Sequence, residues 1–141
     1  MSLVDYSDLE KEIAEAPELK ILPRGTQVKA RLIAVRTGIS DKNGCTWYQP
    51  VFDIPDEPLA LEFNDFIWDV LESKEKLDPK QYARNLTRFK QFSECLSIDY
   101  SKPFSWADLP NDNLTGWVIL GVKKSDEYGD QNTVSKYMVK R

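Results

Sequence analysis

The sequence contains no histidine, which removes the side chain that most often transfers protons near neutral pH. The same absence excludes the usual zinc site. There is no glycine-rich phosphate loop, no nucleophile elbow and no other catalytic motif. We therefore expect a protein that is not an enzyme and that uses no cofactor.

Carboxylates leave one enzymatic alternative, a nuclease that binds Mg²⁺. Asp65, Asp69 and Glu72 lie within one short stretch, and such a site needs clustered carboxylates. A solvated acidic turn is the more common explanation of this spacing. We expect no catalytic residue and no metal ligand here.

Cysteine is scarce, and long apolar runs are missing. Cys45 and Cys95 are too few for a disulfide framework, and we expect both thiols to be reduced and partly buried. No apolar stretch approaches the roughly 20 residues that span a bilayer, and the pattern of a secretory signal is absent. The expectation is a cytoplasmic protein that does not enter a membrane.

The net charge of −4 comes from the first 22 residues, which hold six acids and two bases. The remaining 17 acids and 17 bases cancel, but they are not evenly mixed. Residues 53–78 hold nine acids against two bases. The bases instead form runs, namely Arg24, Lys29, Arg31 and Arg36, then Lys80, Arg84, Arg88 and Lys90, and finally Lys136, Lys140 and Arg141. This distribution predicts a surface with two electrically different sides.

Residues 1–21 form an acidic arm with the pattern of a short amphipathic helix. Ser7 and Glu10 have capping-box spacing. Tyr6, Leu9 and Ile13 follow at helical intervals. The simplest interpretation is a solvated lead-in helix; the sharper one is an arm that covers a basic groove or contacts a partner protein.

The second region, residues 22–141, has short strand patterns and one helix pattern. Val28, Ala30, Leu32 and Ala34 alternate with polar or basic residues, as in a half-buried strand. Asp78 and Pro79 predict a helix start. The expected elements are strands at 27–34, 46–54, 59–64, 117–122 and 132–139, a helix at 79–97, hairpin loops at 38–44 and 125–131, and an ordered loop at 99–115.

The order of these elements is three strands, one helix and two strands. This order predicts a mainly β protein, a five-stranded barrel of the oligonucleotide- and oligosaccharide-binding (OB) type, with the helix between strands three and four. A small α+β sandwich with its helix on one sheet face is the competing class.

The stretch TWYQPVFDI at residues 46–54 places two large aromatics side by side. Successive strand residues point to opposite faces. Tyr48, Phe52 and Ile54 make the better core face, so Trp47 is expected to point outward. It would either stack on a ligand or pack under the helix or the loop 99–115. Phe63, Phe66 and Trp68 are expected in the core.

Four segments occur in a characteristic order: LPRGTQVKARLIAV at 22–35, DKNGCTWYQPVFDI at 41–54, YARNLTRFKQFSECLSI at 82–98, and LTGWVILGVKKSDEYGDQNTVSKY at 114–137. Together they resemble small phage-encoded OB-fold proteins of replication and recombination gene clusters. The resemblance covers residues 22–139 and implies binding of single-stranded DNA. It departs from single-strand-binding proteins in one respect, since the chain ends in VKR and not in an acidic tail.

Single-strand binding needs cations that follow the phosphates and aromatic faces that stack on bases. Strands one and two supply both kinds of residue on their expected outer faces, and the last hairpin supplies more cations and aromatics. The same lysines and arginines could serve solubility alone, as we expect for the helix stripe of Lys80, Arg84 and Arg88. The candidate contacts are Lys29, Arg31, Arg36, Trp47, Gln49, Lys123, Lys124, Tyr128, Lys136 and Tyr137.

The sequence thus predicts a single-stranded DNA-binding protein without sequence specificity, acting in phage replication or recombination in the cytoplasm of a bacterial host. The alternative is a protein-interaction module of the same complexes with no DNA binding of its own. In either case the acidic arm is the candidate contact for a phage or host protein, and self-association stays open.

Overall fold

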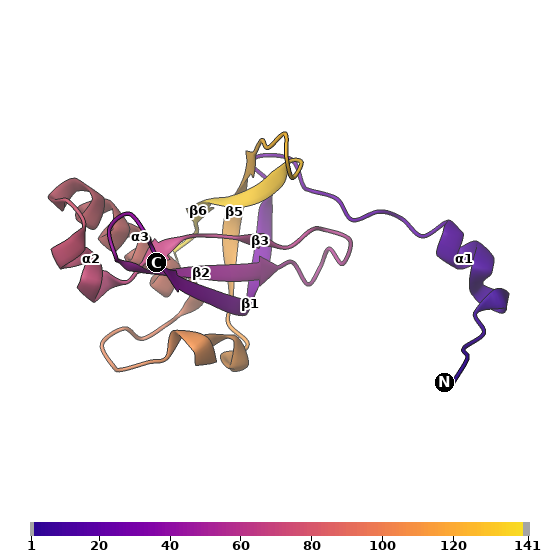
Figure 1. Ribbon diagram of the computed structural model, residues 1–141, viewed down its shortest axis with the longest axis horizontal. Coiled ribbons are helices and arrows are strands. Elements are labelled where there is room, and N and C mark those ends of the chain that lie inside the picture. The colour runs from indigo at the N-terminus through magenta and orange to yellow at the C-terminus, as the bar shows by residue number, and fades with distance from the viewer. Residues whose placement is uncertain (1, 140–141) are drawn as a thin grey trace.

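Five strands close into a barrel in the computed structural model, which describes residues 2–139 (Figure 1). The predicted basic chain end, Lys140 and Arg141, lies outside the described residues. The strands are β1 (Gln27–Ile39), β2 (Thr46–Asp53), β3 (Phe63–Asn64), β5 (Thr115–Lys123) and β6 (Gln131–Tyr137). They pair in the cyclic order β1-β2-β3-β6-β5-β1, with β3 and β6 parallel and the other pairs antiparallel. The predicted OB-like barrel is confirmed.

The barrel closes because β1 bends and pairs on both sides. Its first half, from Gln27, pairs with β5, and its second half, to Ile39, pairs with β2. The register with β2 shifts between Leu32 and Ala34, which marks a β-bulge at Ile33. A bulge increases the local twist and turns the following side chains to the opposite face.

The interior is built from the inward faces of these strands and one helix. Val28, Ala30 and Leu32 are buried, as the alternation predicts. Phe52, Phe63 and Phe92 lie around them with 0–2% of their surface exposed. Each such ring contributes on the order of 1.5–3 kcal/mol through burial, so the aromatic core is a main source of stability.

Helix α3 (Pro79–Leu96) lies between β3 and β5 in the chain and matches the predicted helix closely. The Asp78 carboxylate accepts a hydrogen bond from the Gln81 backbone N–H at 2.8 Å, and Pro79 is the first helical residue. The helix ends at Ser97, whose backbone is left-handed with φ of 60°. Its last turns bury Phe92, Cys95 and Leu96 against the barrel. Both cysteines are buried.

The predicted third strand at 59–64 is wrong in extent. Only Phe63 and Asn64 pair with β2, and the chain then bends into a second short strand, β4 (Ile67–Trp68). Leu59 and Leu61 are exposed, because the segment between them forms an isolated bridge to Lys20. Helix α2 (Val70–Lys76) and the 3₁₀ helix η2 (Trp106–Asp112) were not predicted.

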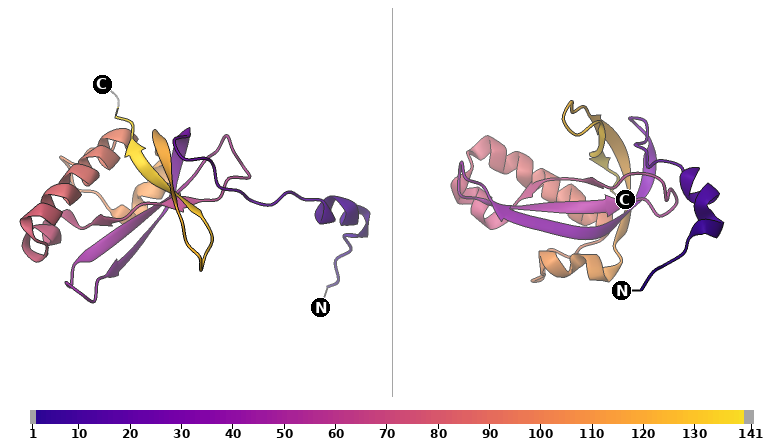
Figure 2. Two further views of the ribbon diagram at one scale, coloured as in Figure 1. Left: turned by 90° about the horizontal axis from the view of Figure 1, so that it is seen from above. Right: turned by 45° about the vertical axis from the view of Figure 1, so that its right-hand side comes forward.

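The N-terminal arm contains a 3₁₀ turn, η1 (Ser7–Leu9), and a short helix, α1 (Glu10–Ala14), with no buried residue. The predicted capping box is wrong: Asp5 accepts the Ser7 N–H at 2.9 Å instead. The arm stands away from the barrel in Figure 1 and in the left view of Figure 2. Lys20 joins it to the barrel through hydrogen bonds with Leu59 and Leu61. None of the helices within residues 2–139 combines the length and the apolar character that a bilayer crossing needs.

Candidate nucleic-acid interface

An exposed aromatic cluster lies on the outer face of β2 and β4. Trp47 on β2 pairs across the strands with Trp68 on β4. Phe66 lies between them, with its ring centroid 5.6 Å from that of Trp47 and 4.8 Å from that of Trp68. Phe66 is 44% exposed and the two indoles are half-buried. We call these three residues the outer aromatic cluster.

Gly38 of β1 makes room for Trp47. The two residues are register partners, and a Cβ at Gly38 would lie 2.5 Å from Trp47 Cζ2. Only glycine therefore lets the indole lie across β1 at this point. Trp47 points to the face opposite Tyr48 and Phe52, as the alternation predicts.

Helix α3 holds the other two rings of the cluster. The Asn85 side chain accepts a hydrogen bond from the Trp68 N–H at 2.8 Å and donates one to the Trp68 carbonyl at 2.9 Å. Asp65 accepts the Phe66 N–H at 2.8 Å and also pairs with Arg88 at 2.8 Å. Side chains from a rigid helix thus fix the backbone of the cluster.

Two of the three aromatics predicted in the core are placed differently. Phe63 is buried, whereas Phe66 is exposed and Trp68 is half-buried. The bend between β3 and β4, where Asp65 turns inward, sends the Phe66 ring outward. Sequence alternation alone gives no sign of this bend.

Polar and cationic residues continue the same outer face along β1 and β2. Arg36 lies opposite Gln49, two residues from the pair of Gly38 and Trp47. Arg36 is exposed, and no carboxylate within residues 2–139 forms an ion pair with it. The bulge at Ile33 places Arg36 on this face, and the structure therefore brings Arg36, Trp47 and Gln49 together.

Arg31 lies further along this face and is already paired. Its Nε donates to Asp53 Oδ1 at 3.0 Å, and its Nη2 donates to Asp53 Oδ2. These hydrogen bonds and the charge of Asp53 raise the pKa of the Arg31 guanidinium. Because Asp53 balances the charge of Arg31, Arg31 attracts a phosphate less strongly than Arg36 does.

Lys29 belongs to a different surface, on β1 and β5. It lies opposite Trp117, whose side chain is 47% exposed. The prediction of a buried strand at 117–122 missed this outward tryptophan. The signal was its alternation with Val118 and Leu120, both of which are fully buried.

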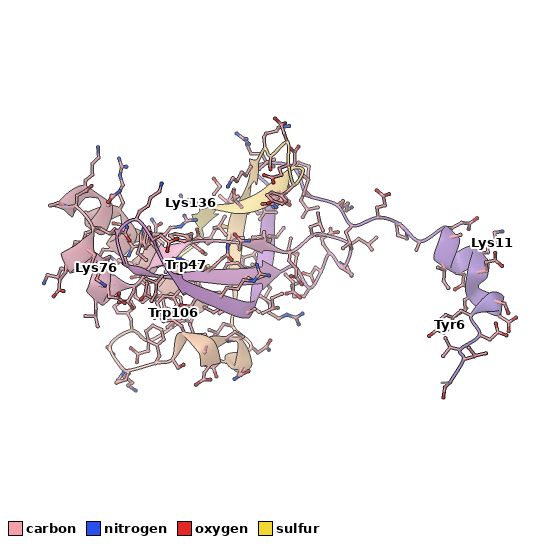
Figure 3. The ribbon with its side chains drawn as sticks, in the orientation of Figure 1. Tyr6, Lys11, Trp47, Lys76, Trp106 and Lys136 are labelled. Atoms are coloured by element: carbon pink, nitrogen blue, oxygen red, sulfur yellow. The ribbon has the colours of Figure 1, made fainter. Side chains whose placement is uncertain are left out.

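The last hairpin carries a third group of predicted contacts. Lys123, Tyr128 and Lys136 are exposed. Lys124 is also exposed, and its ammonium lies 3.2 Å from Asp130. Figure 3 labels Lys136 on β6 and Trp47 on β2. The hairpin group is separate from the outer aromatic cluster in the strand order, with β3 between them.

Tyr137 does not join the hairpin group. It is 1% exposed, donates a hydrogen bond from its hydroxyl to Asp65 at 2.7 Å, and lies under the Arg88 guanidinium at 4.8 Å. Burial, followed by the charge of Asp65, raises the pKa of this phenol well above 10. The register shift between Ile119 and Leu120 turns Tyr137 inward and Lys136 outward.

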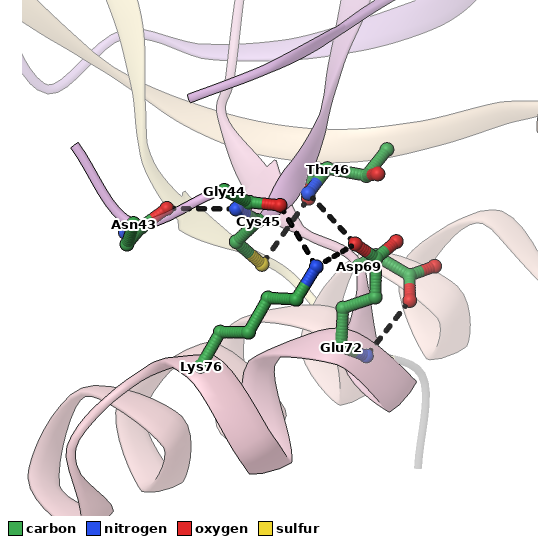
Figure 4. Close-up of polar contacts among 7 residues, drawn as sticks. All are labelled: Asn43, Gly44, Cys45, Thr46, Asp69, Glu72 and Lys76. Atoms are coloured by element: carbon green, nitrogen blue, oxygen red, sulfur yellow. Dashed lines mark hydrogen bonds and ion pairs between the residues drawn. The ribbon is translucent and has the colours of Figure 1, made fainter. Parts of the chain in front are cut away.

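The hairpin at 40–45 is tied to helix α2 (Figure 4). Lys76 Nζ donates to the Gly44 carbonyl at 2.9 Å and to Glu72 at 3.1 Å. Glu72 also accepts the Thr46 N–H at 3.3 Å. The bonds from Thr46 and Lys76 lower the pKa of Glu72. This loop is therefore held in place next to the outer aromatic cluster.

The carboxylates considered for Mg²⁺ each have a separate structural partner. Asp69 caps α2 by accepting the Glu72 N–H at 3.0 Å, Glu72 holds the hairpin, and Asp65 pairs with Arg88. Within residues 2–139, no three metal-ligating side chains gather around one point.

No protein-family model matches the chain, and no curated protein matches it significantly. The features that bear on function are therefore the OB-like barrel and the side chains on its outer faces.

Proposed function

We propose that the chain binds single-stranded DNA without sequence specificity and performs no chemistry. It would act in phage DNA replication or recombination in the cytoplasm of a bacterial host. The observation that carries the proposal is the outer aromatic cluster, which lies beside Arg36 and Gln49 on the β2 and β3 side of the barrel. OB-type barrels bind oligonucleotides on this side, between the loops that join strands one to two and four to five.

The chemistry of this face suits a flexible, unpaired strand. Stacking of a base on an aromatic ring contributes roughly 1–3 kcal/mol and tolerates any base. Phosphates would follow Arg36 and, toward the other loop, Lys123 and Lys136. Asp53 on β2 and Asp65 next to Phe66 do not oppose this path strongly, because Asp53 pairs with Arg31 and Asp65 pairs with Arg88.

The test is a titration of labelled oligo-dT, followed by fluorescence anisotropy at low and at moderate salt. The variants are Trp47→Ala and Phe66→Ala, with Trp117→Ala as a matched control on the other face. We expect the first two to weaken binding by about 1–3 kcal/mol each and the control to bind like the wild type. Binding should also weaken as salt increases, because phosphate contacts release counterions.

A wild type that does not bind oligo-dT at low salt contradicts the proposal. Equal losses in Trp47→Ala and Trp117→Ala would contradict the choice of face. Circular dichroism of each variant separates loss of binding from loss of folding.

A second candidate is a protein-interaction module without DNA binding. Its specific support is the arm, whose Tyr6, Leu9 and Ile13 are 46–61% exposed and touch no part of the barrel. The oligo-dT titration distinguishes the two candidates, because only the second survives a complete absence of binding.

A further inference from the structure

A second aromatic surface lies on the side of β2 opposite the outer aromatic cluster. It is a cavity of about 700 Å³ between the start of β2, the start of α2, helix α3 and the segment 100–106. Five aromatic side chains dominate its lining: Tyr48, Phe89, Tyr100, Phe104 and Trp106. We call it the aromatic pocket.

The walls of the pocket are ordered by ring contacts. Trp106 stacks on Tyr48, with centroids 4.4 Å apart and planes at 9°, and also on Phe92 at 5.5 Å. Phe104 stacks on Phe89 at 6.3 Å. Tyr100 and Phe104 are still 51% and 38% exposed. The pocket is therefore a formed apolar surface that nothing within residues 2–139 covers.

Two lysines and one carboxylate, Asp69, also line the pocket, and Asp69 is already engaged as the N-cap of α2. Lys90 forms no ion pair with any described carboxylate. Lys102 forms a long ion pair with Asp99, at 3.9 Å, and the side chains of Lys102 and Asp99 are both largely exposed. An apolar cavity edged by lysines suits an apolar segment that carries acidic residues.

The N-terminal arm of this chain has that character. Its exposed Tyr6, Leu9 and Ile13 repeat at helical intervals, and Glu10, Glu12 and Glu15 lie among them. Helices of this kind bind grooves through side chains spaced three, four or seven residues apart.

The arm is badly placed to reach the pocket of its own chain. Lys20 is hydrogen-bonded to residues 59–61. The seven residues that lead from Lys20 back to Ile13 span at most about 25 Å when fully extended. Figures 1 and 2 show the arm leaving the barrel on the side away from α2 and α3, and Figure 3 shows Tyr6 and Trp106 at opposite parts of the molecule. Strand β2 runs between the two regions, since Tyr48 near its start lines the pocket and its far end at Asp53 leads to residues 59–61.

We propose that the arm of one copy inserts its Tyr6, Leu9 and Ile13 side chains into the aromatic pocket of a second copy. The acidic residues of the arm then face Lys90 and Lys102. Two copies can exchange arms reciprocally, which gives a closed symmetric dimer. This association uses neither the outer aromatic cluster nor Arg36, so it stands or falls separately from DNA binding.

The test is sedimentation equilibrium of the full chain over a range of concentrations. The arm variant is Ile13→Ser and the pocket variant is Phe104→Ala; both side chains are partly exposed, so the barrel should still fold. The matched control is Ile39→Ser, an exposed isoleucine at the end of β1 (68% exposed). We expect the dimer dissociation constant to rise at least about tenfold in the first two variants and to stay unchanged in the control.

A mixture of the two variants gives the sharpest result. Phe104→Ala keeps an intact arm and Ile13→Ser keeps an intact pocket, so the mixture should form a heterodimer through one arm and one pocket. Lys90→Glu should weaken the wild-type dimer, and Lys136→Glu should not.

Three outcomes would overturn the proposal. The first is a wild type that stays monomeric at all concentrations. The second is self-association that Phe104→Ala leaves unchanged. The third is a monomer in which Phe104→Ala speeds proteolysis of the arm, since this would place the arm in the pocket of its own chain.

Discussion

At the scale of single residues, the molecule depends on a few close approaches. Trp47 and Cys95 each lie against a glycine on a neighbouring strand, Gly38 and Gly116. The two contacts differ in kind. At Gly38 the obstacle to a Cβ is the far end of a half-exposed indole, whereas at Gly116 it is both the Cys95 sulfur at 2.6 Å and the Cys95 carbonyl oxygen at 2.7 Å. A side chain can swing away, but the backbone of a packed helix cannot.

Alanine at these two glycines should therefore have different effects. We expect Gly116→Ala to lower the free energy of unfolding by about 1–3 kcal/mol, because overpacking displaces helix α3. Gly38→Ala should cost less, but it should move the Trp47 indole toward solvent and shift the tryptophan emission to longer wavelength. Urea unfolding and emission spectra of both variants check this, and a larger loss of stability in Gly38→Ala would contradict it.

Asn85 is the second residue with a specific structural role. It is 7% exposed and binds both the N–H and the carbonyl of Trp68. Asn85→Ala should lower the free energy of unfolding by roughly 1–3 kcal/mol, because buried backbone groups lose their partner. Alanine favours helix more than asparagine does, so a loss cannot come from the helix itself. Thr87→Ala, on the exposed side of the same helix, is the matched control for urea unfolding and should be near neutral.

At the scale of secondary-structure elements, local signals predicted some parts well. The alternation of Val28, Ala30 and Leu32 identified β1, and Asp78 with Pro79 identified the start of α3. The strand order and the single long helix favoured the barrel over the competing α+β sandwich, and the barrel is the fold that the structure shows. For β1 and α3, the residues that gave the prediction are the same residues that form the element.

The parts that failed depend on pairing between distant segments. The bulges in β1 and in the β5–β6 pair change which face the following residues occupy. Tyr137 was expected with the other residues around the last hairpin, but it points into the core. The segment 59–64 alternates like a strand, yet its first half, residues 59–61, pairs with Lys20 of the arm linker and not with a barrel strand. Phe66 and Trp68 were expected in the core. Nothing in the local sequence shows that Asp65 pairs with Arg88 of α3, or that Asn85 binds the backbone of Trp68. Of the three residues of the outer aromatic cluster, only Trp47 was therefore predicted to face outward.

The contact between hairpin 40–45 and α2 should depend on pH. The pKa of Glu72 is lowered from its ordinary value of 4.5 by the bonds from Thr46 and Lys76. A carboxylate with a depressed folded-state pKa adds stability above its unfolded pKa and loses it as the pH falls through the folded value.

Wild type should then be more stable than Glu72→Gln at pH 7, and the difference should shrink as the pH falls below about 4.5. Urea unfolding across this range is the measurement. Glu75→Gln, on the exposed side of α2, should show no such convergence. A difference between Glu72→Gln and wild type that is constant with pH would contradict the role of the ionised carboxylate.

At the scale of the whole molecule, charge is divided between the arm and the barrel. The first 22 residues account for the entire net charge of −4, and their six acids all lie between Asp5 and Glu18, in the segment that stands away from the barrel in Figure 1. A nucleic acid approaching the outer face meets a barrel that is neutral overall, together with an acidic segment that is attached to it near Lys20. Repulsion from that segment acts over about one Debye length, which is roughly 10 Å at 0.1 M salt.

Under the proposed function, the arm acids should weaken DNA binding. We expect the triple variant Glu10→Gln, Glu12→Gln and Glu15→Gln to bind oligo-dT more tightly than the wild type at low salt. The two should bind alike once salt screens the arm, because no arm residue belongs to the outer aromatic cluster or its neighbours. Anisotropy titrations at protein concentrations where sedimentation shows a monomer separate this effect from self-association. Equal affinities at low salt would show that the arm stays clear of the DNA path, whereas weaker binding by the triple variant would mean that its carboxylates hold the arm in a position that assists binding.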